Sequence, residues 1–155
     1  LVKKTVESIV FYGLEKEMYL TAFQRRIPIL GLESGRELLE HAREINPVIQ
    51  THIIATWPTN LPFLIKAYQP QIISLGWLTQ PFTISLMSKV LYQLIALTID
   101  LKSQIKEAGE MGVKVLGGVV NKPEDVSYFE ELGVNGIMTD RPHEMLKFLK
   151  ENKIP

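Results

Sequence analysis

The sequence predicts an α/β fold in which parallel strands alternate with crossover helices. Three observations in residues 113–142 lead to this prediction. VKVLGGVV is a short, continuous apolar run, typical of a strand that is buried on both faces. NKPEDVSYFEELG carries the signals of a helix, and VNGIMT is a second apolar run. Strand, helix and strand within about thirty residues indicate parallel strands joined by a helix.

Local signals place the ends of this helix. Asn121 and Glu124 match an Asn-x-x-Glu capping box, with a proline in the first turn. Gly133 supplies the left-handed residue that ends a helix. We therefore expect a helix from Asn121 to Gly133. Another helix is expected to begin near Pro142, with an apolar face made of Met145, Leu146 and Leu149.

The same alternation runs through the rest of the chain and predicts one domain over residues 1–155. The expected strands are the apolar runs at residues 18–23, 49–56, 71–77, 113–120 and 134–139. The other expected helices cover residues 2–14, 36–45, 59–68 and 101–110. Composition agrees with a globular domain, because 46% of the residues are hydrophobic and 22% are charged.

Residues 78–100 interrupt this rhythm and form an expected insertion. A helical apolar stripe is formed there by Leu86, Met87, Val90, Leu91, Leu94 and Leu97. It lies opposite the polar residues Ser85, Ser88, Lys89 and Gln93. The favoured interpretation is an amphipathic helix packed on the sheet, and the other is an interfacial or lid helix near the mouth of the fold. Gly76, Pro81 and Lys89 interrupt the run before the ~20 apolar residues of a transmembrane helix accumulate.

Charge and cysteine content exclude several classes of function. Lys and Arg number 17, as do Asp and Glu, so there is no basic excess to hold nucleic acid. The absence of cysteine excludes disulfides and cysteine-ligated zinc in this chain. A cytoplasmic or peripheral-membrane location is expected.

Three stretches resemble the glycerophosphodiester phosphodiesterase family. GVNGIMTDRP is similar to the family's last barrel strand, Gly-Val-Asp-Gly-Ile-Ile-Thr-Asp-x-Pro. VKVLGGVVNKPEDV is similar to its seventh strand and following helix, and YGLEKEMYLTAF to its fourth strand. The resemblance implies strands four to eight of a (βα)8 TIM barrel. We therefore expect a partial barrel of about five parallel strands with an inserted amphipathic helix.

The resemblance also implies an activity for the intact protein. That activity is metal-dependent hydrolysis of a glycerophosphodiester to glycerol 3-phosphate and an alcohol, with Mg or Ca as the divalent cation. In the family, a His-Arg follows the first strand, a Glu-x-Asp lies on the second strand with another histidine downstream, and a Glu-x-Lys ends the third. The carboxylates hold the cation, and the two histidines serve as acid and base. None of these motifs has a matching position here. We therefore expect no catalytic residue and no metal ligand in this chain, and we expect it to need a missing barrel half or self-association.

Six residues near predicted strand ends are candidates for lining a substrate pocket: Phe23, Trp57, Trp77, Asn121, Asp140 and Arg141. Barrel enzymes place function at the carboxyl ends of their strands. Arg141 suits a phosphate, whereas for Asn121 and Asp140 the favoured role is that of a helix cap, and a pocket role is the alternative. The tryptophan of the family's Trp-Thr-Val-Asn pattern falls on Gly118, so an aromatic wall is absent or is supplied by Trp77. This leaves room for a lysophospholipid-like substrate beside the usual glycerophosphodiesters.

His52 lies in an apolar strand and has two interpretations. It is expected to be a core histidine with one satisfied hydrogen bond, and the other reading is a proton carrier that faces the barrel interior. The alternative to an enzyme is a non-catalytic, barrel-derived binding or assembly module with peripheral membrane contact. An uncovered apolar face and open sheet edges would require such a module to associate with its missing barrel half, a second copy or a membrane surface.

Overall fold

The structure is a computed structural model that describes residues 19–23, 35–55, 58–77 and 82–151. The helix expected over residues 2–14 lies outside these ranges, as does the candidate Trp57. Phe23 lies at the end of a described strand.

Five strands form one parallel sheet, which confirms the predicted fold class. They are β1 (Tyr19–Phe23), β2 (Gln50–Ala55), β3 (Ile72–Leu75), β4 (Lys114–Gly117) and β5 (Gly136–Ile137). Their order in the sheet is β1-β2-β3-β4-β5, and every pair is parallel. Each strand therefore lies beside the next one in the chain, as in the wall of a (βα)8 barrel. The last two strands are shorter than their apolar runs.

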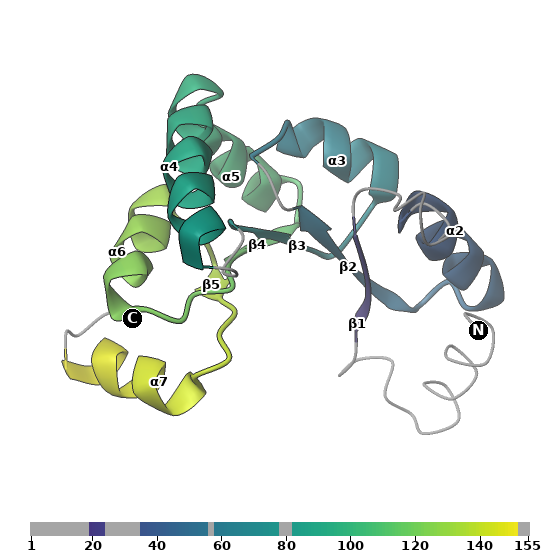
Figure 1. Ribbon diagram of the computed structural model, residues 1–155. Coiled ribbons are helices and arrows are strands. Elements are labelled where there is room, and N and C mark those ends of the chain that lie inside the picture. The colour runs from purple at the N-terminus through teal and green to yellow at the C-terminus, as the bar shows by residue number, and fades with distance from the viewer. Residues whose placement is uncertain (1–18, 24–34, 56–57, 78–81, 152–155) are drawn as a thin grey trace.

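The described helices are α2 (Gly35–Ile45), α3 (Leu61–Tyr68), α4 (Phe82–Thr98), α5 (Leu101–Glu110), α6 (Pro123–Leu132) and α7 (Pro142–Glu151). Helices α2, α3 and α5 follow one side of the sheet, and α6 and α7 continue beside β5 (Figure 1). The core lies between this helical layer and the sheet. Its fully buried side chains include Leu64, Ile73, Leu75, Val115 and Phe129.

The opposite face of the sheet is where the interior of a closed barrel would lie. The His52 ring Nε2 and the Ser74 hydroxyl are 2.6 Å apart on this face, and the hydroxyl donates to Met138 Sδ at 3.3 Å. Side chains alternate along a strand, so Ile54, which is half-buried, shares the face. His52 is thus a buried residue that faces the barrel interior. Burial lowers the pKa of its imidazole, which favours the neutral ring.

Helix α4 is oriented opposite to the favoured prediction. The apolar stripe does not pack on the sheet, because Ile84, Leu86, Met87, Val90, Leu91, Leu94 and Leu97 are each 48% to 79% exposed. We call these seven residues the α4 face. The buried side of the helix instead carries Ser88, Tyr92 and Ala96. Tyr92 packs edge-on against Trp77, with ring centroids 5.5 Å apart. Packing of Tyr92 against Trp77, rather than packing on the sheet, therefore decides which side of α4 faces inward.

The end of α6 agrees with the prediction, but its start does not. Gly133 ends the helix with φ of 81°, as expected for a left-handed terminal residue. The helix begins at Pro123 after Lys122, without a side-chain cap, so the predicted Asn121 capping box is wrong. The side chain of Asn121 is turned toward Thr139 and Asp140, which follow the neighbouring strand.

The apolar face predicted for α7 is correct in part. Met145 is buried and Leu149 is half-buried, whereas Leu146 is 53% exposed.

Candidate functional site

A pocket of about 340 Å³ lies where the connections that follow β3, β4 and β5 meet α4 and α6. It contains four of the six predicted candidates: Trp77, Asn121, Asp140 and Arg141. Its other lining residues are Ser85, Leu86 and Lys89 from α4, Val119 and Lys122 from the segment that leads into α6, and Asp125 from the first turn of α6. Parallel strands place their carboxyl ends at one edge, which explains why residues far apart in the sequence meet here.

Asn121 and Asp140 form the polar floor of the pocket. Asn121 Nδ2 donates to the Asp140 carboxylate at 2.9 Å, and the Asp140 amide donates to Asn121 Oδ1 at 2.9 Å. The Thr139 hydroxyl also donates to Asn121 Oδ1, at 3.2 Å. The two residues therefore join the ends of β4 and β5. The Asp140 carboxylate accepts a hydrogen bond from Asn121 across the strand ends, and the capping role considered for Asp140 stays a prediction.

The aromatic wall of the pocket is Trp77. Its ring stacks on Phe129 with centroids 5.1 Å apart and planes 14° from parallel. A Cβ at Gly118 would lie 2.9 Å from Met138 Cβ, so a larger residue does not fit at that position in this backbone. Trp77 therefore lines the pocket from its packing on Phe129, whereas a side chain at Gly118 would point toward Met138.

A partly buried ion pair joins α4 to α6 beside this wall. Lys89 Nζ contacts the Asp125 carboxylate, and the side chain of Asp125 is 8% exposed. Lys89 Nζ also lies 5.4 Å from the centroid of the Trp77 ring, within cation–π range. Prediction missed both residues, although Lys89 is the only charge within α4 and was therefore a signal.

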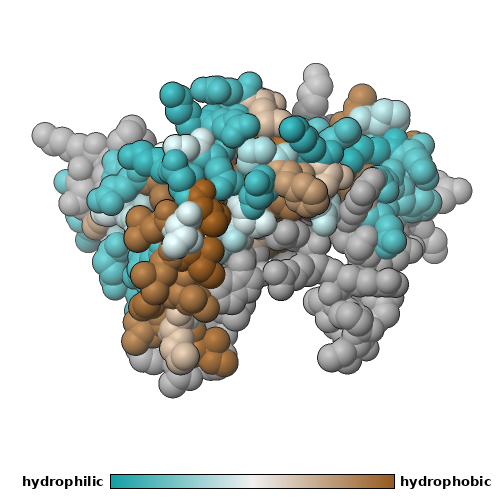
Figure 2. Space-filling model, turned by 90° about the horizontal axis from the view of Figure 1, so that it is seen from above, coloured by the Kyte–Doolittle hydropathy of each residue, from teal (hydrophilic) through white to brown (hydrophobic). Residues whose placement is uncertain are grey.

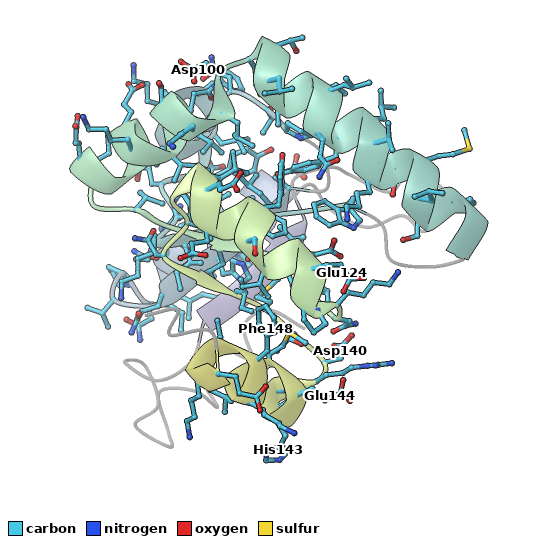
Figure 3. All side chains as sticks on the ribbon, turned by 90° about the vertical axis from the view of Figure 1, so that its left-hand side faces the viewer. Asp100, Glu124, Asp140, His143, Glu144 and Phe148 are labelled. Atoms are coloured by element: carbon cyan, nitrogen blue, oxygen red, sulfur yellow. The ribbon has the colours of Figure 1, made fainter. Side chains whose placement is uncertain are left out.

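The outer rim of the pocket carries charge of both signs. Arg141 and Lys122 are exposed. Arg141 Nη1 lies 3.4 Å from Glu144 Oε2 on the first turn of α7. Figure 3 shows Asp140 and Glu144 on the same side of the molecule, whereas His143 points away below α7. Guanidinium and ammonium groups at such a rim suit a phosphate oxygen.

The described residues do not fit a metal ion by themselves. In the four described ranges, no group of three or more histidine, aspartate or glutamate side chains lies close enough to hold one. The two carboxylates in the pocket are also engaged, Asp125 by Lys89 and Asp140 by Asn121. We therefore derive no chemical step through a cation from these side chains.

Three solved structures resemble this fold over nearly the whole chain. One is described as a glycerophosphoryl diester phosphodiesterase from Silicibacter pomeroyi, with TM-score 0.67, 20% identity and 97% of this chain covered. A second is a glycerophosphodiester phosphodiesterase from Parabacteroides distasonis, with TM-score 0.62, 14% identity and 98% covered. A third is a phosphodiesterase from Oleispira antarctica in complex with its product sn-glycerol-3-phosphate, with TM-score 0.58, 12% identity and 97% covered.

The matches cover only part of these proteins. This chain spans 43% of the Silicibacter chain and 51% of each of the other two. No family model matches the sequence, and no curated protein is similar to it. The fold of this chain is that of a partial (βα)8 barrel, which it shares with these three solved structures.

Proposed function

We propose that this chain is the carboxyl-terminal part of a phosphodiesterase that hydrolyses glycerophosphodiesters to glycerol 3-phosphate and an alcohol. The observation that carries the proposal is the pocket at the carboxyl ends of β3, β4 and β5. It lies at the edge where barrel enzymes bind their substrates. The fold likeness to three phosphodiesterases supports the same reading.

In this proposal the described residues bind and orient the substrate. Arg141 and Lys122 would contact the phosphate, and Trp77 would close one side of the pocket. Asn121 would hold Asp140 and Arg141 in place through the link between the strand ends. Proton transfer, and the divalent cation that the family resemblance implies, would depend on groups other than the described pocket residues. This chain alone should therefore show no metal-stimulated hydrolysis.

Glycerophosphocholine and lysophosphatidylcholine are suitable first substrates. The protein should be purified at the full length of its reading frame, and release of glycerol 3-phosphate or its acylated form measured. Arg141→Ala should raise KM about tenfold with little change in kcat, because a charge-assisted contact is worth ~1.5–3 kcal/mol. Lys150→Ala, an exposed cation on the last turn of α7, is the matched control.

Two results would count against this proposal. An unchanged KM in Arg141→Ala would show that Arg141 does not contact the substrate phosphate. Turnover by this chain alone that survives His52→Gln and scales with its concentration would place the active site in residues not identified above.

A second candidate is a binding module without catalysis, and the tight packing at Gly118 favours it. The family's aromatic residue at this position has no room in this backbone, so an aromatic side chain cannot enter from Gly118. Binding of glycerophosphocholine without turnover in the full-length protein, abolished by Arg141→Ala, would support this candidate over the enzyme.

A further inference from the structure

The α4 face is a contiguous apolar surface on the outside of the molecule. Its seven residues form a brown band along α4, next to mostly hydrophilic surroundings (Figure 2). Single exposed apolar side chains are common in soluble proteins, but a continuous patch of this kind marks a site of interaction. Six of the seven, all but Leu97, also line an open hollow along the helix, together with Ser88.

We propose that the α4 face binds the surface of a phospholipid bilayer, with α4 lying in the plane of the membrane. The face consists only of isoleucine, leucine, methionine and valine. The one charged residue of α4, Lys89, is turned away from it toward Asp125 on α6. Aliphatic burial is non-directional and suits hydrocarbon, whereas the centres of protein interfaces favour tyrosine, tryptophan and arginine.

The width of the face favours a lipid surface over a second copy of the helix. With residues set 100° apart, the face covers an arc of roughly 160° from Leu86 to Ile84. A paired helix would contact a narrower strip, formed at heptad spacing by Met87, Val90, Leu94 and Leu97. The flanking apolar side chains would then stay in water. A bilayer surface removes the whole arc from water.

The length of α4 indicates that it lies on the membrane rather than across it. Its 17 residues amount to roughly 25 Å, and a spanning helix needs about 20 predominantly apolar residues. Among the described residues no single helix is long and apolar enough to cross a membrane; α4 and α5 together reach that length and composition, but with a bend of 70°. Exposed Lys102, Lys106 and Glu107 on α5 suit water or lipid headgroups rather than hydrocarbon.

The α4 face adjoins the pocket, so docking through this face would orient the pocket toward the membrane. Leu86 belongs to the α4 face and also lines the pocket. Docking would therefore bring the pocket mouth, with Arg141 and Lys122, to the depth of the lipid phosphates. Exposed acidic side chains of Asp140 and Glu144 balance these two cations. We therefore expect attachment to depend on apolar burial, with little effect of salt or of anionic lipid.

Vesicle sedimentation tests the proposal without any enzyme assay. The full-length protein should bind vesicles of phosphatidylcholine, and equally well vesicles that also contain phosphatidylserine, at low and high salt. Leu94→Gln and Leu97→Gln should each weaken partitioning about tenfold, since each removes a buried leucine side chain. Phe63→Gln is the matched control, because Phe63 is 66% exposed on α3 and lies outside the α4 face. An equal loss in all three variants, or no binding at all, would overturn the proposal.

A spin label gives a second, independent measurement. The chain has no cysteine, so Leu97→Cys and Phe63→Cys each introduce a single labelling site in it. With vesicles, the label at position 97 should become accessible to oxygen dissolved in lipid, and the label at 63 should stay in water. A label at 97 that stays in water, or that is already buried in protein without vesicles, would contradict the proposal. A dimer that Leu97→Gln dissociates, with no vesicle binding, would instead identify a second copy as the occupant. Neither measurement depends on catalysis, so the membrane proposal and the phosphodiesterase proposal can fail separately.

Discussion

Asn121 and Asp140 are joined by two hydrogen bonds of 2.9 Å across the ends of β4 and β5. The amide side chain both donates and accepts, so it bonds to the carboxylate and to the backbone N–H of Asp140 at once. Through this link, residues that follow two different strands are held in one pocket wall. The spacing of β4 and β5 in the sheet therefore sets the positions of Asn121 and Asp140 in the pocket.

Asn121→Ala should lower the free energy of unfolding by about 1–2 kcal/mol, because it removes bonds to Asp140 and Thr139 at a partly exposed position. Asn121→Asp should cost more at neutral pH, since it places a second carboxylate against Asp140. Urea unfolding of both variants checks this. The extra cost of Asn121→Asp should shrink at high salt, which screens repulsion between exposed charges. An extra cost that does not change with salt would contradict the repulsion argument.

Lys89 and Asp125 should be energetically coupled. Asp125→Ala leaves the Lys89 ammonium partly buried without its carboxylate, and Lys89→Met leaves the buried carboxylate without its cation. Each single change should destabilise the protein by about 1–3 kcal/mol, and the double variant should lose less than the sum. A double-mutant cycle by urea unfolding measures the difference. Strict additivity would mean that the pair contributes nothing beyond its separate side chains.

Two Gly→Ala substitutions should have opposite signs. A Cβ at Gly76 would lie 1.8 Å from the carbonyl oxygen of Gly118, a backbone atom that cannot move without shifting the connection after β4. Gly76→Ala should therefore destabilise by at least the ~1–3 kcal/mol typical of overpacking. Gly109 lies in α5 with open space around it, so Gly109→Ala should stabilise by about 0.5–1 kcal/mol. Thermal unfolding of both proteins, measured side by side, separates the two effects.

His52 should make the fold sensitive to mild acid. Burial lowers the pKa of its imidazole, so between the folded pKa and the ordinary value of about 6.5 the unfolded chain binds more protons than the folded one. The stability contribution is complete above pH ~6.5 and is lost as the pH falls through the folded pKa. His52→Gln should therefore show a smaller drop in unfolding free energy between pH 8 and pH 5. His143→Gln, which changes an exposed histidine, is the matched control.

Much of the fold could be predicted because its signals are local. Stretches rich in apolar residues at 49–56 and 71–77 predict strands, and the structure has β2 and β3 there. The left-handed glycine at 133 ends α6 as expected. Four of the six candidate pocket residues meet at one edge, since all four follow strands whose ends coincide. Whether they bind substrate stays a prediction.

The sequence by itself determined which stretches form strands and helices, and their order along the chain, because propensity and periodicity act over a few residues. Only the tertiary structure decided which surfaces meet. The apolar stripe of α4 faces outward because the aromatic cluster of Trp77 and Tyr92, with the Lys89–Asp125 pair, holds the opposite side of the helix. Asn121 bonds across to Asp140 because β5 brings that partner within reach, which no local pattern encodes.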